Sequence, residues 1–169
     1  LFIGSGRRQA WLEEAIARRG LTNVTTSKER RRGDQSVFLR ACDIAVMAFV
    51  PGMRGLGVPS RLYNILASGR PVVGAVDPAS EPGLVIAEER VGWVVPPARA
   101  EALAGAILEA SESPEKLAEM GARAREAARV RYRQADAVAR YAALLAPFGL
   151  RARASGSDSR TGSLRGARP

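Results

Sequence analysis

The stretch GVPSRLYNILASGR (57–70) holds the residues with the clearest potential for chemistry. Pro59 suits the start of a helix, and it leaves the N–H groups of Ser60 and Arg61 without partners inside that helix. The positive end of the helix dipole and the Arg61 guanidinium would both attract an anion. Gly57 allows the backbone to approach a ligand closely, and no acidic residue is present to repel a phosphate. The stretch is therefore a candidate phosphate-binding helix start.

The same helix would be amphipathic. Its buried face carries Leu62, Ile65 and Leu66. Its opposite face carries Arg61, Asn64 and Ser68, which could hydrogen-bond a ligand with hydroxyl groups. An ordinary capped helix with a polar, solvent-facing side accounts equally well for this spacing, so both interpretations stay open.

A second glycine-rich segment, GSGRR (4–8), follows the apolar run LFI. Gly4 and Gly6 form half of a dinucleotide-binding fingerprint, whose third glycine would fall on Gln9. Arg7 could meet a phosphate at the start of the following helix. A plain glycine turn with solvated arginines is the alternative, and it is the one that the residues favour.

Several kinds of chemistry are excluded by residue type. The chain has no histidine and one cysteine, Cys42, so a Ser-His-Asp triad is excluded and a zinc site is strongly disfavoured. No Asp-x-Asp pair occurs, which disfavours a divalent metal held by carboxylates. We therefore expect no cofactor and no metal, and any anionic group must be held by positive charge and backbone amides.

The elements that would position these residues alternate along the chain. Short apolar runs alternate with amphipathic segments, a pattern typical of an α/β fold with a parallel sheet. The expected strands are residues 1–4, 23–26, 43–49, 71–76 and 92–95. We expect five parallel strands with helices on both faces, in one domain over residues 1–147. Residues 148–169 are rich in Arg, Ser and Gly, and we expect a disordered basic tail there.

The net charge of +9, from 26 Lys and Arg against 17 Asp and Glu, indicates anionic partners. Nucleic acid is one alternative. It is disfavoured because aromatic residues make up only 5% of the chain, no nucleic-acid-binding motif appears, and the charge does not gather on one helix.

Two stretches carry a family resemblance: residues 34–81, which end VPSRLYNILASGRPVVGAVDPASE, and GWVVPPARAEALAGAI. They resemble the C-terminal, nucleotide-sugar-binding domain of GT-B group 1 (family 4-like) glycosyltransferases, in particular bacterial enzymes that build surface polysaccharides. The resemblance covers roughly residues 1–146. It implies a Rossmann-like sheet that binds a nucleotide-diphosphate sugar at the carboxyl ends of its strands. It also implies a cytoplasmic location, with contact at the inner face of the membrane through an anionic surface or a lipid-linked acceptor.

The resemblance assigns roles to individual residues. Those that match the loop and helix start at the donor pyrophosphate are Gly57, Pro59, Ser60 and Arg61. The family's two glutamates, seven residues apart, fall on Leu56 and Asn64, and only Asn64 can take over a hydrogen bond to the ribose. Ser80 and Glu81 match a position near the same cleft, and a helix N-cap followed by a first-turn acid is their alternative.

The resemblance further implies that the acceptor domain and the first strand of this domain lie before Leu1. The fragment alone would then bind the donor without catalysing transfer. A catalytically silent truncated remnant is a second possibility. Because the last helix of such proteins returns to the acceptor domain, we expect Tyr141, Leu144 and Leu145 to be exposed.

Overall fold

The computed structural model describes residues 1–3, 6–27 and 32–148. The chain divides into two compact units, Leu1–Tyr132 and Arg133–Pro169, and α7 (Gln134–Leu145) is the α-helix of the second. Gly4 and all of the basic tail except Phe148 lie outside the described residues.

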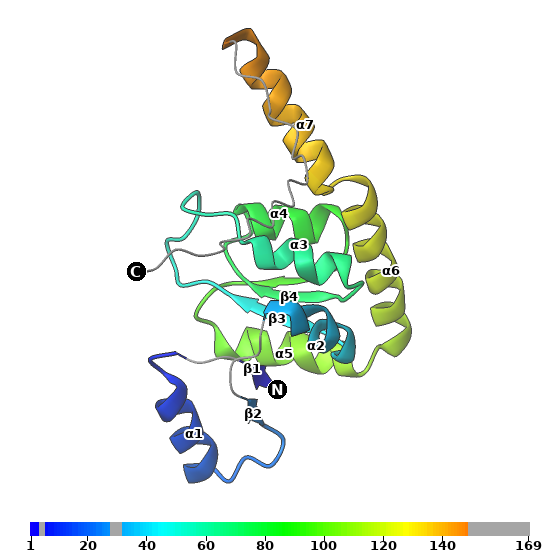
Figure 1. Ribbon diagram of the computed structural model, residues 1–169. Helices are drawn as coiled ribbons and strands as arrows, with labels where there is room; N and C mark the ends of the chain where they lie inside the picture. Colours follow the sequence, from blue (N-terminus) through cyan, green and yellow to red (C-terminus); the bar gives the residue numbers. More distant parts are fainter. Residues whose placement is uncertain (4–5, 28–31, 149–169) are drawn as a thin grey trace, which may run out of the picture. The chain divides into compact units, whose positions relative to one another are not determined.

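The described residues of the first unit include five strands, all paired in parallel (Figure 1). Strand β1 (Phe2–Ile3) pairs with β2 (Thr26–Ser27). Strands β3 (Ala45–Ala48), β4 (Val72–Ala75) and β5 (Gly92–Val95) form a second sheet in that order. The predicted α/β class with parallel strands is confirmed. The expectation of one five-stranded sheet is wrong: within the described residues, β1 pairs with β2 and β3 pairs with β4, so these strands make two sheets.

The burial of each strand follows its place in the larger sheet. All four residues of the central strand β4 are buried, as its uninterrupted apolar sequence requires. In the edge strand β3, burial alternates: Ala45 and Met47 are buried, whereas Val46 is exposed.

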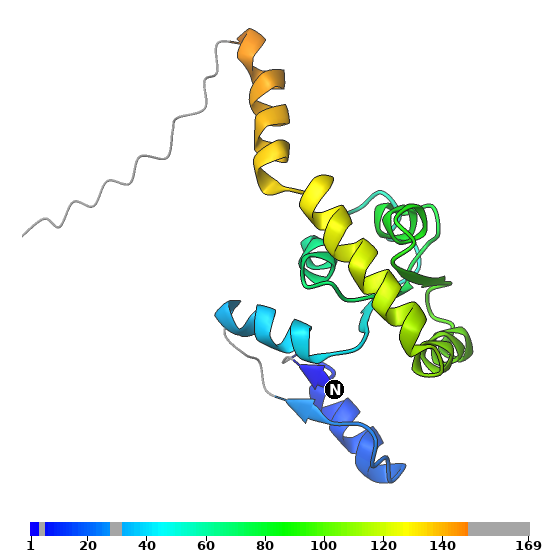
Figure 2. The same ribbon diagram turned by 90° about the vertical axis from the view of Figure 1, so that its right-hand side faces the viewer.

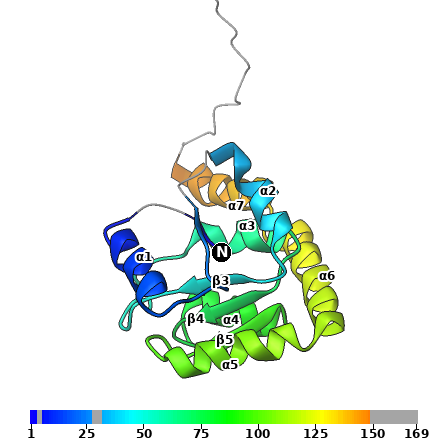
Figure 3. The same cartoon turned by 90° about the horizontal axis from the view of Figure 1, so that it is seen from below.

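Helices cover both faces of the larger sheet. Figure 1 shows α3 and α4 above it and α5 below it. The helices of the first unit are α1 (Gln9–Arg18), α2 (Gln35–Ala41), α3 (Ser60–Ala67), α4 (Glu81–Glu88), α5 (Ala100–Ser111) and α6 (Pro114–Val130). Two short 3₁₀ turns, Arg32–Asp34 and Ala146–Phe148, complete the described elements. Figure 3 shows β3, β4 and β5 side by side from below.

Helix α3 is fixed by its apolar face. Leu62, Ile65 and Leu66 are at most 1% exposed, as the sequence predicted. Figure 2 shows α6 passing beside α3, and Gly121 of α6 lies against the carbonyl of Gly69 in the turn that follows α3. A Cβ on Gly121 would stand 2.6 Å from the Gly69 oxygen, so this contact requires glycine.

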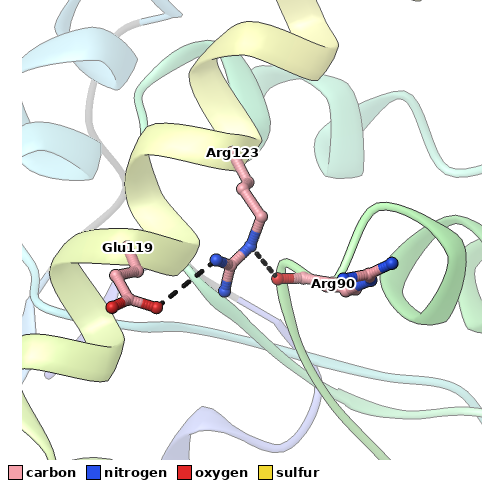
Figure 4. Close-up of polar contacts among 3 residues, drawn as sticks. All are labelled: Arg90, Glu119 and Arg123. Carbon is pink, nitrogen blue, oxygen red and sulfur yellow. Dashed lines mark hydrogen bonds and ion pairs between the residues drawn. The ribbon is translucent and has the colours of Figure 1, made fainter.

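Helix α6 also holds the turn that joins α4 to β5 (Figure 4). The Nε–H of Arg123 donates to the carbonyl oxygen of Arg90 at 2.9 Å. Arg90 has a φ of 52°, so this contact stabilises a residue in the left-handed region. The same guanidinium forms an ion pair with Glu119 at 3.5 Å.

The second unit has an exposed apolar surface. No residue of α7 is buried, and Tyr141, Leu144 and Leu145 are 68%, 68% and 44% exposed, which confirms the expectation for this helix. Among the described residues, no helix combines the length and the hydropathy needed to cross a bilayer.

Candidate functional site

The carboxyl ends of the three strands in the larger sheet open onto a small cavity of about 160 Å³. Strands β3, β4 and β5 run parallel, so the segments that follow them meet at one edge. The cavity is lined by residues from all three of these segments: Phe49, Val50, Pro51, Gly52, Met53, Arg54, Asp77, Ser80 and Pro97. The sequence had pointed to Ser80 alone among them.

The start of α3 lies at the end of the loop that leaves β3. Pro59 is its N-cap residue, with extended backbone (φ −76°, ψ 110°) and no side chain capping the helix. The N–H of Leu62 donates to the Pro59 carbonyl at 3.0 Å. Within the described part of the chain, the N–H groups of Ser60 and Arg61 donate to nothing. Two amides are therefore left open for a ligand, as the sequence predicted.

Arg61 extends from this helix start into solvent. Its guanidinium has no ion pair or hydrogen bond with any residue that the structure describes. Gly57, two residues before Pro59, has open space where a side chain would be. A full positive charge and two free amides thus share one helix end, a combination that suits an anion.

Asn64 faces a second, larger cavity of about 690 Å³ beside α2. The lining residues come from α2 and the turn before it, from the polar face of α3 and from α6: Gly33, Gln35, Ser36, Leu39, Arg40, Asn64, Ala67, Ser68 and Arg125. The Ser68 hydroxyl donates to the backbone carbonyl of Asn64 at 2.9 Å. The side-chain amide of Asn64 has no hydrogen bond to any residue that the structure describes. The sequence did not anticipate the contribution of α2.

Ser80 and Glu81 begin α4. Ser80 is 3% exposed, and its hydroxyl donates to the Asp77 carbonyl at 2.5 Å and accepts from the Gly83 N–H at 3.4 Å. Ser80 is thus the N-cap of α4, the alternative that the sequence left open. Glu81 accepts a hydrogen bond from the Tyr63 hydroxyl at 3.3 Å, which ties α4 to α3.

An aromatic pair links Tyr63 of α3 to Tyr132, which follows α6. The sequence analysis did not predict this pair. The rings of Tyr63 and Tyr132 are 5.1 Å apart and tilted by 44°. The Tyr132 hydroxyl donates to Glu89 at 2.9 Å, and Arg131 pairs with the same carboxylate at 2.7 Å. Burial, and then the hydrogen bond to Glu89, raises the pKa of Tyr132 above its usual range.

The glycine-rich segment near the N-terminus is placed elsewhere. The Gly6 carbonyl accepts from the Gln9 N–H at 3.0 Å in the turn before α1, and Arg7 is exposed in that turn. Neither residue lines either of the two cavities described above. Gly4 lies outside the described residues.

Comparison with known proteins defines the class to which this fold and site belong. Residues 1–127 match the family model for "Glycosyl transferases group 1". The chain therefore belongs to the group 1 glycosyltransferase family.

Among its relatives is a Pseudomonas aeruginosa protein named "Probable glycosyltransferase WbjE". The two are 33% identical over 152 residues, which is 87% of this chain and 36% of the relative. The chain thus spans little more than a third of that relative's length.

Solved structures of GT-B glycosyltransferases share the fold. Anabaena Alr3699/HepE, whose crystal structure is in complex with UDP, has a TM-score of 0.72 at 22% identity, over 86% of this chain and 40% of its own. Sucrose-phosphate synthase from Thermosynechococcus elongatus has a TM-score of 0.72 at 20% identity, over 87% and 37%. At these identities the likeness establishes a Rossmann-like GT-B fold.

Proposed function

We propose that this chain is the donor-binding part of a glycosyltransferase, and that it binds a nucleotide-diphosphate sugar at the carboxyl edge of its larger sheet. The observation that carries the proposal is the open start of α3, where two free amides meet the unpaired Arg61 guanidinium. In a group 1 glycosyltransferase, the natural anion for such a helix start is the pyrophosphate of the donor.

In this proposal the two cavities hold the two ends of the donor, the nucleoside and the sugar. With the pyrophosphate on Ser60 and Arg61, we assign the Asn64 amide, one turn along α3, to the ribose. The nucleoside then lies toward the 690 Å³ cavity beside α2. The sugar is assigned to the 160 Å³ cavity that follows the strands.

Glycosyl transfer from such a donor breaks the bond between the anomeric carbon and the pyrophosphate oxygen. Negative charge grows on that oxygen as the nucleoside diphosphate leaves. Fixed dipoles and charges stabilise such a leaving group without having to reorganise during the reaction. The α3 amides and Arg61 are assigned this task. No cluster of three or more His, Cys, Asp or Glu side chains occurs among the described residues, so the proposal includes no metal.

The acceptor is assigned to the rest of the protein, because this chain spans only 36% of its relative. A polysaccharide or lipid-linked acceptor, with contact to an anionic membrane surface, belongs to the same proposal. Transfer itself requires the acceptor to be aligned with the anomeric carbon and water to be excluded, which the donor-binding part alone does not achieve.

Calorimetric titration of UDP and GDP into the chain tests the donor site. Arg61→Ala should lose a charge-assisted contact of roughly 1.5–3 kcal/mol, about ten- to a hundredfold in affinity. Asn64→Ala should lose about 1 kcal/mol, because a neutral hydrogen bond contributes less. The control is Arg140→Ala, which removes an exposed arginine of α7 and should leave the affinity unchanged.

Equal affinity in wild type and Arg61→Ala would refute the pyrophosphate assignment. A wild-type chain that melts cooperatively but binds neither nucleotide would favour the silent remnant instead. Melting curves of each variant serve as the folding control, since neither substitution touches the buried face of α3.

A further inference from the structure

The 160 Å³ cavity at the strand ends has a mixed lining of charged and apolar side chains. Its charged residues are Arg54, from the loop after β3, and Asp77, from the turn after β4. At ~30 Å³ per water molecule, the cavity has room for about five waters. It therefore fits a sugar ring or part of one, and it is too small for a whole nucleotide sugar. The apolar side chains that line it are those of Phe49, Val50, Met53 and Pro97.

Two charged groups of this cavity have no partner. One Asp77 carboxylate oxygen, Oδ1, accepts from the Ala79 N–H at 2.8 Å. The Ser80 hydroxyl has both a donor and an acceptor partner, Gly83 and Asp77. Among the lining side chains, all of which the structure describes, only the Arg54 guanidinium and the second Asp77 oxygen, Oδ2, have no hydrogen bond or ion pair with a described residue. A cation and a carboxylate oxygen thus share one small cavity without pairing with each other.

The chemistry of these two groups is complementary. The Arg54 guanidinium can only donate hydrogen bonds, and the free Asp77 oxygen can only accept them. A sugar hydroxyl does both, so neighbouring hydroxyl groups can accept from Arg54 and donate to Asp77 at the same time. A sugar carboxylate has no proton for Asp77 and would bring a second negative charge into the cavity, where like charges repel. The two groups together therefore favour a ligand without a charge of its own.

We propose that Arg54 and Asp77 determine the specificity for the donor sugar, and that they select an uncharged, hydroxylated sugar over a uronic acid. The inference rests on the proposed function, which assigns the sugar to this cavity. Arg54 donates to one hydroxyl oxygen, and Asp77 Oδ2 accepts from a hydroxyl of the same ring. Each of these bonds has one ionised partner and so belongs to the stronger class of hydrogen bond. The apolar part of the lining is left for the C–H groups of the ring.

Two pairs of donors that differ only at C6 test this inference on the wild-type chain by calorimetry. They are UDP-glucose with UDP-glucuronate, and GDP-mannose with GDP-mannuronate. UDP and GDP alone identify which base the site accepts. Within the accepted pair, the neutral donor should bind about tenfold more tightly, because the uronate forfeits one charge-assisted hydrogen bond.

The variant Asp77→Asn tests the carboxylate. Asparagine keeps an oxygen for the Ala79 N–H and replaces Oδ2 with an NH₂ donor, so the cavity then offers only donors and a positive charge. The affinity ratio should move about tenfold or more toward the uronate. The control is Asp43→Asn, an exposed aspartate just before β3 that does not line this cavity, and it should leave the ratio unchanged.

The variant Arg54→Met tests the guanidinium. It should weaken the neutral nucleotide sugar about tenfold and leave the affinity for the nucleotide diphosphate alone unchanged, since only a contact to the sugar is lost. An equal loss for both would assign Arg54 to the pyrophosphate and overturn the inference. Melting curves check that each variant is folded. If Asp77→Asn is not, the wild-type ratio and Arg54→Met decide.

The remaining outcomes separate this inference from the proposed function. Nucleotide binding with equal or tighter affinity for the uronate overturns the inference and leaves the proposed function standing. A ratio that a folded Asp77→Asn chain does not change has the same meaning. Failure of both UDP and GDP to bind refutes the proposed function, and the inference with it.

Discussion

Two helix starts at the same edge of the sheet differ in one residue-level property: whether their amides are occupied. At α4, the Ser80 hydroxyl accepts from the Gly83 N–H. At α3, Pro59 is the N-cap and has no side chain that can do this. The free start could be predicted from the sequence, because proline carries neither a donor nor an acceptor in its side chain. The capping role of Ser80 could not be predicted from the sequence, because a serine before a helix can either cap the helix or contact a ligand.

A stability measurement tests the cap at α4. Ser80→Ala should lower the free energy of unfolding by about 1–2 kcal/mol, because a buried N–H then loses its partner. The matched control is Ser111→Ala, at the exposed end of α5, where the hydroxyl donates to the Leu108 carbonyl and the change should stay within about 0.5 kcal/mol. Urea unfolding of both variants gives the comparison. Equal midpoints for the two would contradict the capping role.

The Tyr132 phenol supplies a prediction about alkaline pH. Burial, and then its hydrogen bond to Glu89, raises the pKa of Tyr132 in the folded chain, whereas the unfolded phenol ionises near its usual value of about 10. The contribution of the neutral phenol to stability is therefore complete below about pH 10 and is lost as the pH rises above it. Between pH 9 and 11, wild type should lose unfolding free energy more steeply than Tyr132→Phe. Parallel curves would show that the phenol does not cause the loss.

At the scale of elements, the contact between α3 and α6 depends on a missing side chain. A Cβ on Gly121 would stand 2.6 Å from the Gly69 carbonyl oxygen, and the obstacle is backbone that cannot rotate away. Gly121→Ala should therefore cost about 1–3 kcal/mol of unfolding free energy by forcing the helices apart. Gly105→Ala in α5 is the control, because a Cβ there meets nothing within 4 Å. That variant should be neutral or more stable by about 0.5–1 kcal/mol, owing to helix propensity alone. Thermal melts of the two variants test this prediction, and equal melting temperatures would contradict it.

The bounds of α3 followed from its own sequence, because Pro59 and Gly69 mark its two ends and its apolar residues repeat at helical spacing. The arrangement of the strands into two sheets could not be predicted from the sequence in the same way. Which edges pair depends on contacts between residues far apart in the chain, and LFI reads as a strand whichever neighbour it has. For the same reason, the 690 Å³ cavity could not be foreseen: Asn64 and Arg125, which both line it, are 61 positions apart.

At the scale of the whole molecule, the first unit should fold without the second. No residue of α7 is buried, so ending the chain at residue 134 removes little of the core. We expect the free energy of unfolding to change by less than about 0.5 kcal/mol, and the binding of a hydrophobic dye to fall as Val138, Tyr141 and Leu144 are removed. Urea unfolding and dye fluorescence of the two chains provide the test. A clearly less stable short chain would mean that the second unit supports the first.

The open start of α3 also has a consequence for the timescale on which its protons are replaced by solvent deuterium. The amides of Leu62 and later residues are bonded within the helix, whereas those of Ser60 and Arg61 are not, so these two should exchange fastest in α3. An anion seated on them would slow that exchange while leaving the far end of the helix unchanged. Two adjacent amide signals thus form an intrinsic reporter of site occupancy, readable in the isolated chain without an acceptor or a turnover assay.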